Sequence, residues 1–279
     1  MTEIQDLPPL RDIIRDYDLA AKKSLGQNFL LDLNLTRKIA RAAQLPQGCH
    51  VIEVGPGPGG LTRAILEQDI ASLTAIEMDT RCVEALHQVV APVTDKLKVI
   101  EGDALEVNPA EMTPEPRAIV ANLPYNVATP LLIGWLHQAK CYDSLTLMFQ
   151  KEVAMRIAAV PRTKAYGRLS VLSQWLCECE AVFDVPASAF TPPPKITSTI
   201  VRLVPRTLDG PQPAIKTVEK ITGLAFGKRR KMLRQSLKGL VADVPAFLEE
   251  NDILETARAE ELDVNDFIRL ALAYERMMA

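Results

Sequence analysis

The tetrapeptide Asn122-Leu123-Pro124-Tyr125 combines groups that could act on an aromatic amine. An exocyclic amine of adenine is a poor nucleophile, because its lone pair is delocalised into the ring. Two neutral acceptors aimed at its N–H bonds would return that pair to nitrogen. The Asn122 side-chain oxygen and a backbone carbonyl of Leu123 or Pro124 could do this, since proline fixes the local backbone. Tyr125 offers a face on which an unpaired base can stack. Taken alone, the tetrapeptide also fits an ordinary turn after a strand.

A glycine-rich segment forms a second candidate site. It contains Gly55, Gly57, Gly59 and Gly60. The GxGxxG spacing is weak support for a dinucleotide site when taken alone. Pro56 and Pro58 each remove an N–H group that a pyrophosphate would need at a helix start. The segment therefore favours S-adenosylmethionine over NAD, and Glu53 could support the loop or face the cationic end of that ligand.

Acidic residues stand at the ends of the next two expected strands, where Glu77 is the last residue of the second strand. Glu77 comes about twenty residues after the glycines, where a carboxylate accepts hydrogen bonds from ribose hydroxyls. Asp103 follows the third strand and suits the amine of the adenine in the cofactor itself. The residues beside these acids complete the predicted cofactor site: Met78, Gly102 and Ala104. Either acid alone could equally be a capping or surface residue.

Strand and helix patterns alternate through the first two thirds of the chain. Apolar, β-rich stretches cover residues 50–54, 72–77, 97–101, 117–121 and 145–149, with helices expected at 61–68, 81–90 and 130–138. This alternation predicts an α/β fold with a mostly parallel, Rossmann-like sheet. The stretches 183–185 and 197–204 leave no room for a helix between them, which predicts an antiparallel last strand closing the sheet.

A composition shift at residues 205–213, with three prolines and a glycine, predicts a linker. We expect an N-terminal extension at 1–21, a catalytic cofactor-binding domain at 22–207 and a small helical RNA-binding domain at 208–279. The N-terminal extension is acidic, and no role is assigned to it.

Composition excludes several classes of protein. The chain of 279 residues has a net charge of −3 and an ordinary soluble composition. No apolar run reaches the roughly 18 residues that a membrane helix needs. No signal or transit peptide is recognisable, so we expect a cytoplasmic protein. The five cysteines form no CxxC pair, so we expect reduced, mostly buried thiols and no metal site.

The segment 216–238 is strongly basic despite the negative total charge. It holds eight cations, opposed only by Glu219: Lys216, Lys220, Lys228, Arg229, Arg230, Lys231, Arg234 and Lys238. A local basic cluster on such a protein is typical of nucleic-acid binding, although a solvated helix face would have the same composition.

These motifs together resemble the rRNA adenine N6,N6-dimethyltransferases. The resemblance runs from about Lys23 to Leu240, and its segments are 25–30, 53–62, 102–105, 122–125, 150–156, 166–170 and 190–195, together with Glu77. The segments 150–156 and 166–170, the triple proline after Phe190 and the basic stretch 226–237, interpreted as a helix, favour the small-subunit branch of this family. No single motif is specific, but the combination is.

The resemblance implies a function and further site residues. It also implies that the Rossmann-like sheet is of the class I S-adenosylmethionine methyltransferase type. Gln27, Asn28 and Leu30 would close over S-adenosylmethionine as a lid, and Phe190 would stack on the target adenine opposite Tyr125. The implied substrate is a pair of adjacent adenosines in the loop of the 3′-terminal helix of small-subunit (16S) rRNA, within a nearly mature 30S particle. The expected RNA contacts are Lys151, Arg156, Arg168, Lys228, Arg229, Arg230, Lys231 and Arg234.

Three other functions stay open at this point. A large-subunit adenine methylase of the macrolide-resistance type has the same fold, but the small helical domain and the segments 150–170 disfavour it. The intact tetrapeptide disfavours a non-catalytic nucleic-acid binder. The loop prolines, and the lack of a proton-donor constellation, disfavour an NAD-dependent oxidoreductase. We take a monomer as the default state.

Overall fold

The computed structural model describes residues 3–22 and 25–278, so Lys23, where the resemblance begins, lies outside the described residues. The chain forms two compact units. The first comprises Met1–Ala154 with Glu180–Pro205, and the second Met155–Cys179 with Arg206–Ala279. The expected boundary at 207/208 lies near one of these divisions, but residues 155–179 belong to the second unit. The assignment of catalysis and RNA binding to separate domains stays a prediction.

A seven-stranded sheet is the centre of the first unit, with strand order β4-β3-β2-β5-β6-β9-β7. Its strands are β2 (Cys49–Val54), β3 (Ile70–Glu77), β4 (Leu97–Glu101), β5 (Arg117–Ala121), β6 (Ser144–Gln150), β7 (Cys177–Val185) and β9 (Ser198–Pro205). The first five run parallel, and β9 is antiparallel to β6. The central strands β2, β5 and β6 are buried along nearly their whole length because both sheet faces are covered there, whereas β4 at the edge carries exposed Lys98 and Glu101. The α/β prediction is therefore confirmed.

The antiparallel strand lies one position further inside the sheet than expected. β9 pairs with β6, and β7 takes the edge beyond it. The sequence signal at 183–185 was only the end of β7, which begins at Cys177. Exposed polar residues alternate with cysteines there, so the early part of the strand has no continuous apolar run. β9 is the last strand along the chain, but it does not close the sheet.

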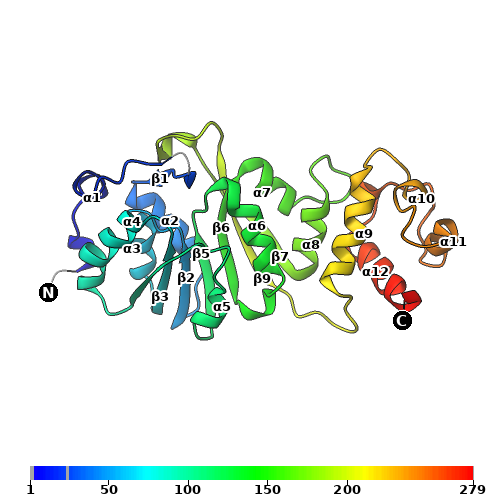
Figure 1. Cartoon of the computed structure of the whole chain (residues 1–279), viewed down its shortest axis with the longest axis horizontal. Helices are drawn as coiled ribbons and strands as arrows, with labels where there is room; N and C mark the ends of the chain where they lie inside the picture. The colour runs from blue at the N-terminus through cyan, green and yellow to red at the C-terminus, as the bar shows by residue number, and fades with distance from the viewer. Residues whose placement is uncertain (1–2, 23–24, 279) are drawn as a thin grey trace. The chain divides into compact units, whose positions relative to one another are not determined.

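Helices follow the parallel strands (Figure 1). They are α3 (Gly60–Leu66), α4 (Thr80–Ala85), α5 (Pro109–Met112), α6 (Tyr125–Leu136) and α7 (Lys151–Ile157), and a π-helical turn at Leu86–Val90 continues α4. Helix α2 (Leu33–Ala42) precedes β2. Helix α6 begins five residues earlier than the expected start at 130. Pro124 precedes its first turn and Pro130 lies inside it, so the proline taken as the helix start is an interior residue.

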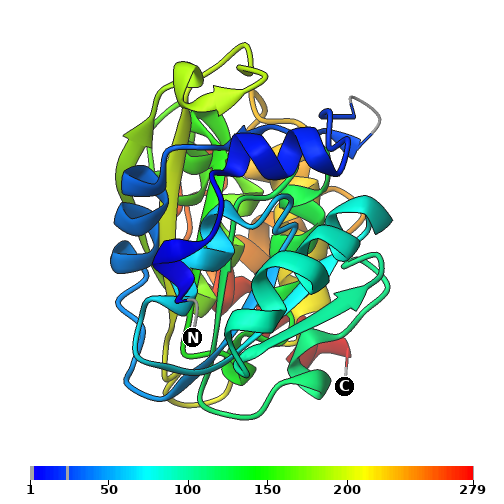
Figure 2. The same ribbon diagram turned by 90° about the vertical axis from the view of Figure 1, so that its left-hand side faces the viewer.

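The N-terminal segment packs against α4. Helix α1 (Leu10–Asp16) buries Ile13, and Leu19 follows it into a small cluster with Cys82 and Ala85. Tyr17 Oη donates to Gln88 Oε1 at 2.9 Å. Figure 2 shows this dark blue segment across the face turned to the viewer. The acidic extension is therefore part of the folded first unit.

The second unit is helical. Its helices are α8 (Arg168–Leu176), α9 (Ile215–Gly227), α10 (Leu233–Ser236), α11 (Val244–Glu249) and α12 (Val264–Met278). Phe226 of α9 packs against Tyr166, which precedes α8, and against Phe267 of α12. The distances between ring centroids are 5.9 Å to Tyr166 and 5.5 Å to Phe267. Among the described residues, no helix is both long and apolar enough to span a membrane.

The prediction that 226–237 forms one basic helix is wrong. Helix α9 ends at Gly227, and residues 228–232 form a turn before α10 begins at Leu233. Arg229 fixes this turn, because its Nε donates to Glu260 at 2.7 Å and its Nη1 and Nη2 donate to backbone carbonyls of Lys164 and Thr163. Tertiary contacts therefore interrupt the helix here, although the composition of the segment is compatible with a helix.

Candidate active site

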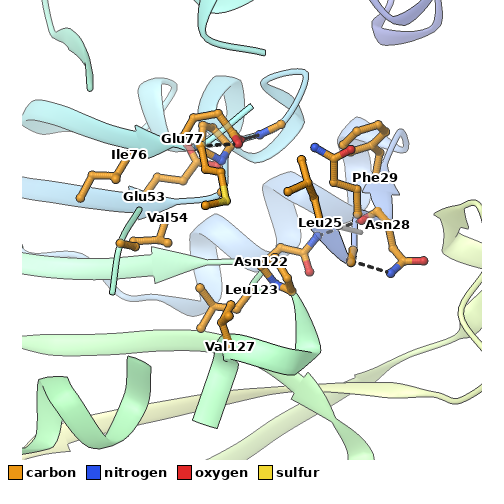
Figure 3. A pocket seen from close by; sticks show the side chains of 18 of the residues that line it. Leu25, Asn28, Phe29, Glu53, Val54, Ile76, Glu77, Asn122, Leu123 and Val127 are labelled. Carbon is orange, nitrogen blue, oxygen red and sulfur yellow. Dashed lines mark hydrogen bonds between the residues drawn. The ribbon is translucent and has the colours of Figure 1, made fainter. Parts of the chain in front are cut away.

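A cavity of about 360 Å³ opens at the carboxyl ends of the parallel strands. Its lining includes every residue predicted for the target-base site: Asn122, Leu123, Pro124, Tyr125 and Phe190. It also includes the predicted cofactor residues Gln27, Asn28, Leu30, Glu53, Gly55, Gly57, Glu77, Met78, Gly102, Asp103 and Ala104. Figure 3 shows the cavity, with Glu53 and Glu77 together on one side and Asn28 away from them. The sequence therefore identified the residues that meet here, while their individual roles stay predictions.

The glycine loop gives the cavity its floor. Gly55 and Gly57 have φ angles of +71° and +55°, a left-handed backbone that residues with a Cβ rarely adopt. A Cβ on Gly57 would lie 3.0 Å from the Phe29 ring, and one on Gly60 would lie 2.6 Å from the Leu30 carbonyl oxygen. The loop can thus approach both the N-terminal segment and a ligand closely.

Gly59 is the one predicted cofactor residue that does not line the cavity. It precedes the first turn of α3 with a φ of +88°, and a Cβ there would lie 3.0 Å from Leu86. The position thus requires glycine because of backbone conformation and packing. Gly60, its neighbour, lines the cavity instead.

Glu53 is a buried acceptor without a partner. Its side chain is 1% exposed, and Oε2 makes no hydrogen bond in the structure. Burial, with a smaller contribution from the Glu77 carboxylate, raises the pKa of the Glu53 carboxyl to about 8. A buried, unpartnered carboxyl beside a cavity matches a cationic ligand group, such as the amino or sulfonium group of S-adenosylmethionine.

Glu77 joins the glycine loop to β3. Its Oε1 accepts hydrogen bonds from the backbone N–H groups of Met78 and Asp79, at 2.8 and 2.9 Å. Its Oε2 accepts from Gly57 N at 2.9 Å. Burial raises the pKa of this carboxyl, whereas these backbone donors oppose the shift. Three of roughly four acceptor positions are used, which leaves Oε2 able to receive a ribose hydroxyl.

Asp103 is arranged differently from Glu77. Its Oδ1 accepts from Leu105 N at 2.9 Å, and its second oxygen has no partner among the described residues. Because this half-buried side chain lines the cavity, that oxygen can accept a hydrogen bond from an adenine amine. Glu53, Glu77 and Asp103 together fit the charge and hydrogen-bonding groups of S-adenosylmethionine.

The Asn122 amide is oriented by the N-terminal segment. Asn122 follows β5, and its Nδ2 donates to the backbone carbonyl of Asn28 at 3.3 Å. An amide whose N–H end is used in this way presents its Oδ1 as the remaining acceptor. That atom is the one the sequence assigns to the target amine. No motif or spacing in the sequence indicates this contact.

A network of polar residues holds the segment that carries Asn28. Gln27 donates through Nε2 to Asp79 Oδ2 at 3.1 Å and accepts from Lys22 N at 2.9 Å. Asp79 also receives Nε and Nη2 of Arg81, and hydrogen bonding to that guanidinium holds the pKa of the Asp79 carboxyl at about 2. Arg81 in turn donates to the backbone carbonyl of Asp18. Gln27 therefore braces the segment and also lines the cavity.

The two aromatic residues of the site, Phe190 and Tyr125, are held in place by different interactions. Strand β1 (Phe29–Leu30) pairs antiparallel with β8 (Phe190–Thr191), with Leu30 opposite Phe190. Phe190 is 3% exposed and lines the cavity. Tyr125 is half-buried at the start of α6, and its hydroxyl lies 2.7 Å from Ser198 Oγ.

Sequence reasoning missed several cavity residues. Leu25, Gly26, Phe29, Pro56, Leu61, Asn126, Val127 and Leu131 also line it. Phe29 lies inside the segment 25–30, so its place between two predicted lid residues was an available signal. Leu61 and Leu131 look like ordinary helix residues in the sequence, and nothing in the spacing distinguishes them.

The predicted RNA-binding residues fall into two groups. Lys228, Arg230, Lys231 and Arg168 are exposed in the second unit. Others form ion pairs within the protein: Lys151 with Asp184 at 2.6 Å, Arg229 with Glu260 at 2.7 Å and Arg234 with Glu255 at 2.9 Å. Arg156 is exposed and also makes an interaction within the protein. RNA contact by any of them stays a prediction, and the geometry favours the first group.

The chain is similar to known proteins along nearly its whole length. The pattern of the family described as ribosomal RNA adenine dimethylase matches residues 19–276. The chain is 55% identical to "ribosomal RNA small subunit methyltransferase A" of Xanthobacter autotrophicus, over 99% of this chain and 97% of that protein. Among solved structures, a dimethyladenosine transferase from Plasmodium falciparum is similar, with a TM-score of 0.76 and 26% identity over 88% of this chain and 96% of that chain. The 23S rRNA methyltransferase ErmE is also similar, with a TM-score of 0.67 and 29% identity over 89% and 100% of the two chains.

Proposed function

The chain belongs to the ribosomal RNA adenine dimethylase family, and from this premise we propose that it methylates N6 of adenines in small-subunit rRNA. The observation that carries the proposal is the Asn122 amide, whose N–H end is held by Asn28 so that its oxygen faces outward as an acceptor. The name shared by the similar curated proteins supports the small subunit as the substrate.

S-adenosylmethionine is the methyl donor, and when bound it supplies an electrophilic methyl group. Glu53 would face its cationic end, Glu77 its ribose and Asp103 its adenine. The glycine loop would lie against it, because Gly55 and Gly57 line the cavity. Both Glu53 and Glu77 are buried at that end of the cavity.

The protein's own groups prepare the target amine. Asn122 Oδ1 and the backbone carbonyl of Leu123 accept its two N–H bonds and bring the lone pair out of conjugation. The Pro124 carbonyl, the other candidate from the sequence, already accepts hydrogen bonds from Val127 N and Ala128 N at 3.1 Å in the first turn of α6. Tyr125 and Phe190 stack on the base and fix its distance from the donor side, which is a large part of the acceleration in group transfer. A methylated ammonium loses its proton readily to water, so this site needs no strong base.

The finer proposal concerns the substrate's context. We assign two methyl groups to each of two adjacent adenosines in the loop of the 3′-terminal helix, in a nearly mature 30S particle, by a monomeric protein. Lys228, Arg230 and Lys231 would contact rRNA phosphates from the turn after α9. The family description, which names a dimethylase, supports the count of methyl groups.

A second candidate is methylation of large-subunit RNA, because ErmE is similar in structure. One experiment separates the two. The purified protein is incubated with labelled S-adenosylmethionine and either unmethylated small subunits or unmethylated large-subunit RNA. We expect label in small-subunit RNA, located at N6-methylated adenosines after digestion. Label in large-subunit RNA alone, or in neither RNA, would overturn the proposal.

A further inference from the structure

The Tyr125 ring is anchored at its far end as well as at its backbone. Its hydroxyl lies 2.7 Å from Ser198 Oγ, across 73 positions of sequence. Ser198 is fully buried, and it is the first residue of β9, opposite Gln150 of β6. The ring therefore spans from the start of α6 to the sheet while lining the cavity.

The residues around Ser198 hold it in place. Before it, Thr197 accepts a hydrogen bond at its carbonyl from Lys151 N at 3.0 Å. After it, Thr199 Oγ1 donates to Asp184 Oδ1 at 2.6 Å, and Lys151 Nζ donates to the other oxygen of that carboxylate at 2.6 Å. Three strand ends thus meet at Ser198, which gives its hydroxyl a fixed position.

A fixed hydroxyl partner has a direct consequence for stacking. A tyrosine side chain turns about two torsions, and a hydrogen bond at its tip restricts the first of them, which decides where the ring lies. Burial raises the pKa of the Tyr125 phenol, so the hydroxyl keeps its proton at neutral pH and the bond persists. The position of the ring in the cavity wall is therefore defined before the base arrives.

We propose that Ser198 is a positioning residue for the target adenine, acting through the hydroxyl of Tyr125. The proposal rests on the function assigned above, because it requires a base to stack on Tyr125. A serine that merely fills space in the core would show the same burial. The two roles differ in what the loss of the hydroxyl alone does to turnover.

The test compares Ser198→Ala with Ser144→Ala. Ser144 lies on neighbouring β6, is also buried, and its hydroxyl has no partner in the structure. We expect Ser198→Ala to lower kcat for unmethylated small subunits by about threefold to tenfold, the effect of one neutral hydrogen bond. We expect Kd for S-adenosylmethionine, measured by calorimetry, to stay unchanged in both variants and Ser144→Ala to keep the wild-type kcat.

A double-mutant cycle assigns the effect to Tyr125. Tyr125→Phe keeps the ring and removes the hydroxyl, so Ser198→Ala should cause no further loss of kcat in that background. Equal kcat for the two serine variants, or losses of kcat that multiply in full in the double variant, would overturn the proposal.

A spectroscopic measurement tests the contact between Tyr125 and Ser198 without relying on enzyme activity. With 13C-labelled tyrosine, the five tyrosines give ring signals that substitution can assign. We expect Ser198→Ala to shift or broaden the Tyr125 ring signal, whereas Ser144→Ala leaves it in place. If the wild type methylates no RNA, the proposed function fails. Independently of that result, an unchanged Tyr125 ring signal in Ser198→Ala would show that Ser198 does not hold the Tyr125 ring in place.

Discussion

The Asn122 side chain has two chemically different ends, and the protein uses both. One end donates to the Asn28 carbonyl, and the other is left for the substrate. An amide in which neither end was held could rotate and offer N–H groups to an amine that also carries N–H groups. Orientation of the amide is therefore as much a part of the site as the asparagine itself.

Replacing this residue should separate binding from chemistry. We expect Asn122→Ala to lower kcat by about 100-fold or more, the usual loss when one oriented group at a reacting centre is removed. Kd for S-adenosylmethionine should change little, because Glu53, Glu77 and Asp103 are intact. Single-turnover transfer and calorimetry measure the two quantities. Asn34→Ala, at an exposed asparagine of α2, is the control. Lost cofactor binding with unchanged turnover would contradict this role.

Glu53 should give the cofactor-free protein a distinct dependence on pH. Its carboxyl has a pKa of about 8 when folded, against an ordinary value of 4.5. Unfolding therefore releases a proton between these values, and rising pH favours the unfolded state in that window. We expect Glu53→Gln to be more stable than the wild type at pH 8, by roughly 2–4 kcal/mol, with the difference shrinking toward pH 5.

Denaturant unfolding at a series of pH values, without cofactor, measures this difference. Glu101→Gln removes an exposed carboxylate on β4 and should show no such trend. A stability difference between Glu53→Gln and the wild type that does not change with pH would count against the buried carboxyl as its source.

At the level of single residues, the sequence predicted side chains better than contacts. Asn122, Glu77 and Asp103 were recognisable because each follows a strand that can be read from its apolar run. The partners of Asn122 and Tyr125 lie 94 and 73 positions away. No local spacing encodes such a pairing, so Asn28 as an orienting group and Ser198 as an anchor required the structure.

At the level of elements, local signals sufficed where they agreed with packing. The strand at Arg117–Ala121 and the strand at Leu97–Glu101 begin and end where the sequence placed them. The turn at 228–232 was misjudged, because a basic, helix-compatible stretch is broken there by Arg229 reaching Glu260 and two backbone carbonyls. Helix propensity is a weak preference, and three hydrogen bonds outweigh it.

The glycine loop allows two effects of a glycine to be separated. Gly57 and Gly48 both have a left-handed backbone, but an added Cβ meets the Phe29 ring at Gly57 and nothing within 4 Å at Gly48. We expect both alanine variants to lose about 1 kcal/mol or more of stability from backbone strain. Only Gly57→Ala should weaken cofactor binding, by about tenfold or more, which corresponds to 1.4 kcal/mol of misfit.

Thermal unfolding and calorimetry with S-adenosylmethionine measure the two effects. Equal loss of cofactor affinity in Gly48→Ala and Gly57→Ala would mean that strain alone, rather than contact with Phe29, explains the need for glycine in the loop.

At the level of the whole molecule, charge is distributed unevenly. The chain carries a net charge of −3, yet the turn after α9 presents three consecutive or near-consecutive exposed cations, Lys228, Arg230 and Lys231. A polyanion responds to such a local field more than to the sum of charges. The acidic N-terminal extension belongs to the first unit, whereas this basic turn belongs to the second. The acidic residues of the extension are therefore far from these cations in the sequence.

This distribution predicts how RNA binding depends on salt. We expect the triple variant Lys228→Ala, Arg230→Ala, Lys231→Ala to bind small subunits more weakly, with the slope of log K against log salt reduced by about 2–3. A second triple variant at Arg11, Arg41 and Lys98, all exposed in the first unit, removes the same charge. Filter binding over a salt series compares them, and equal slopes for the two variants would refute a localised RNA contact.

The short pairing of β1 with β8 links the two halves of the reaction. Leu30, beside the cofactor loop, and Phe190, on the wall for the base, share one ladder of backbone hydrogen bonds. If the N-terminal segment opens to exchange spent donor for fresh donor, as the lid proposed for it requires, the wall formed by Phe190 loosens as well. A base that is to receive two methyl groups would then be seated twice, and the intermediate with one methyl group could escape between the two rounds.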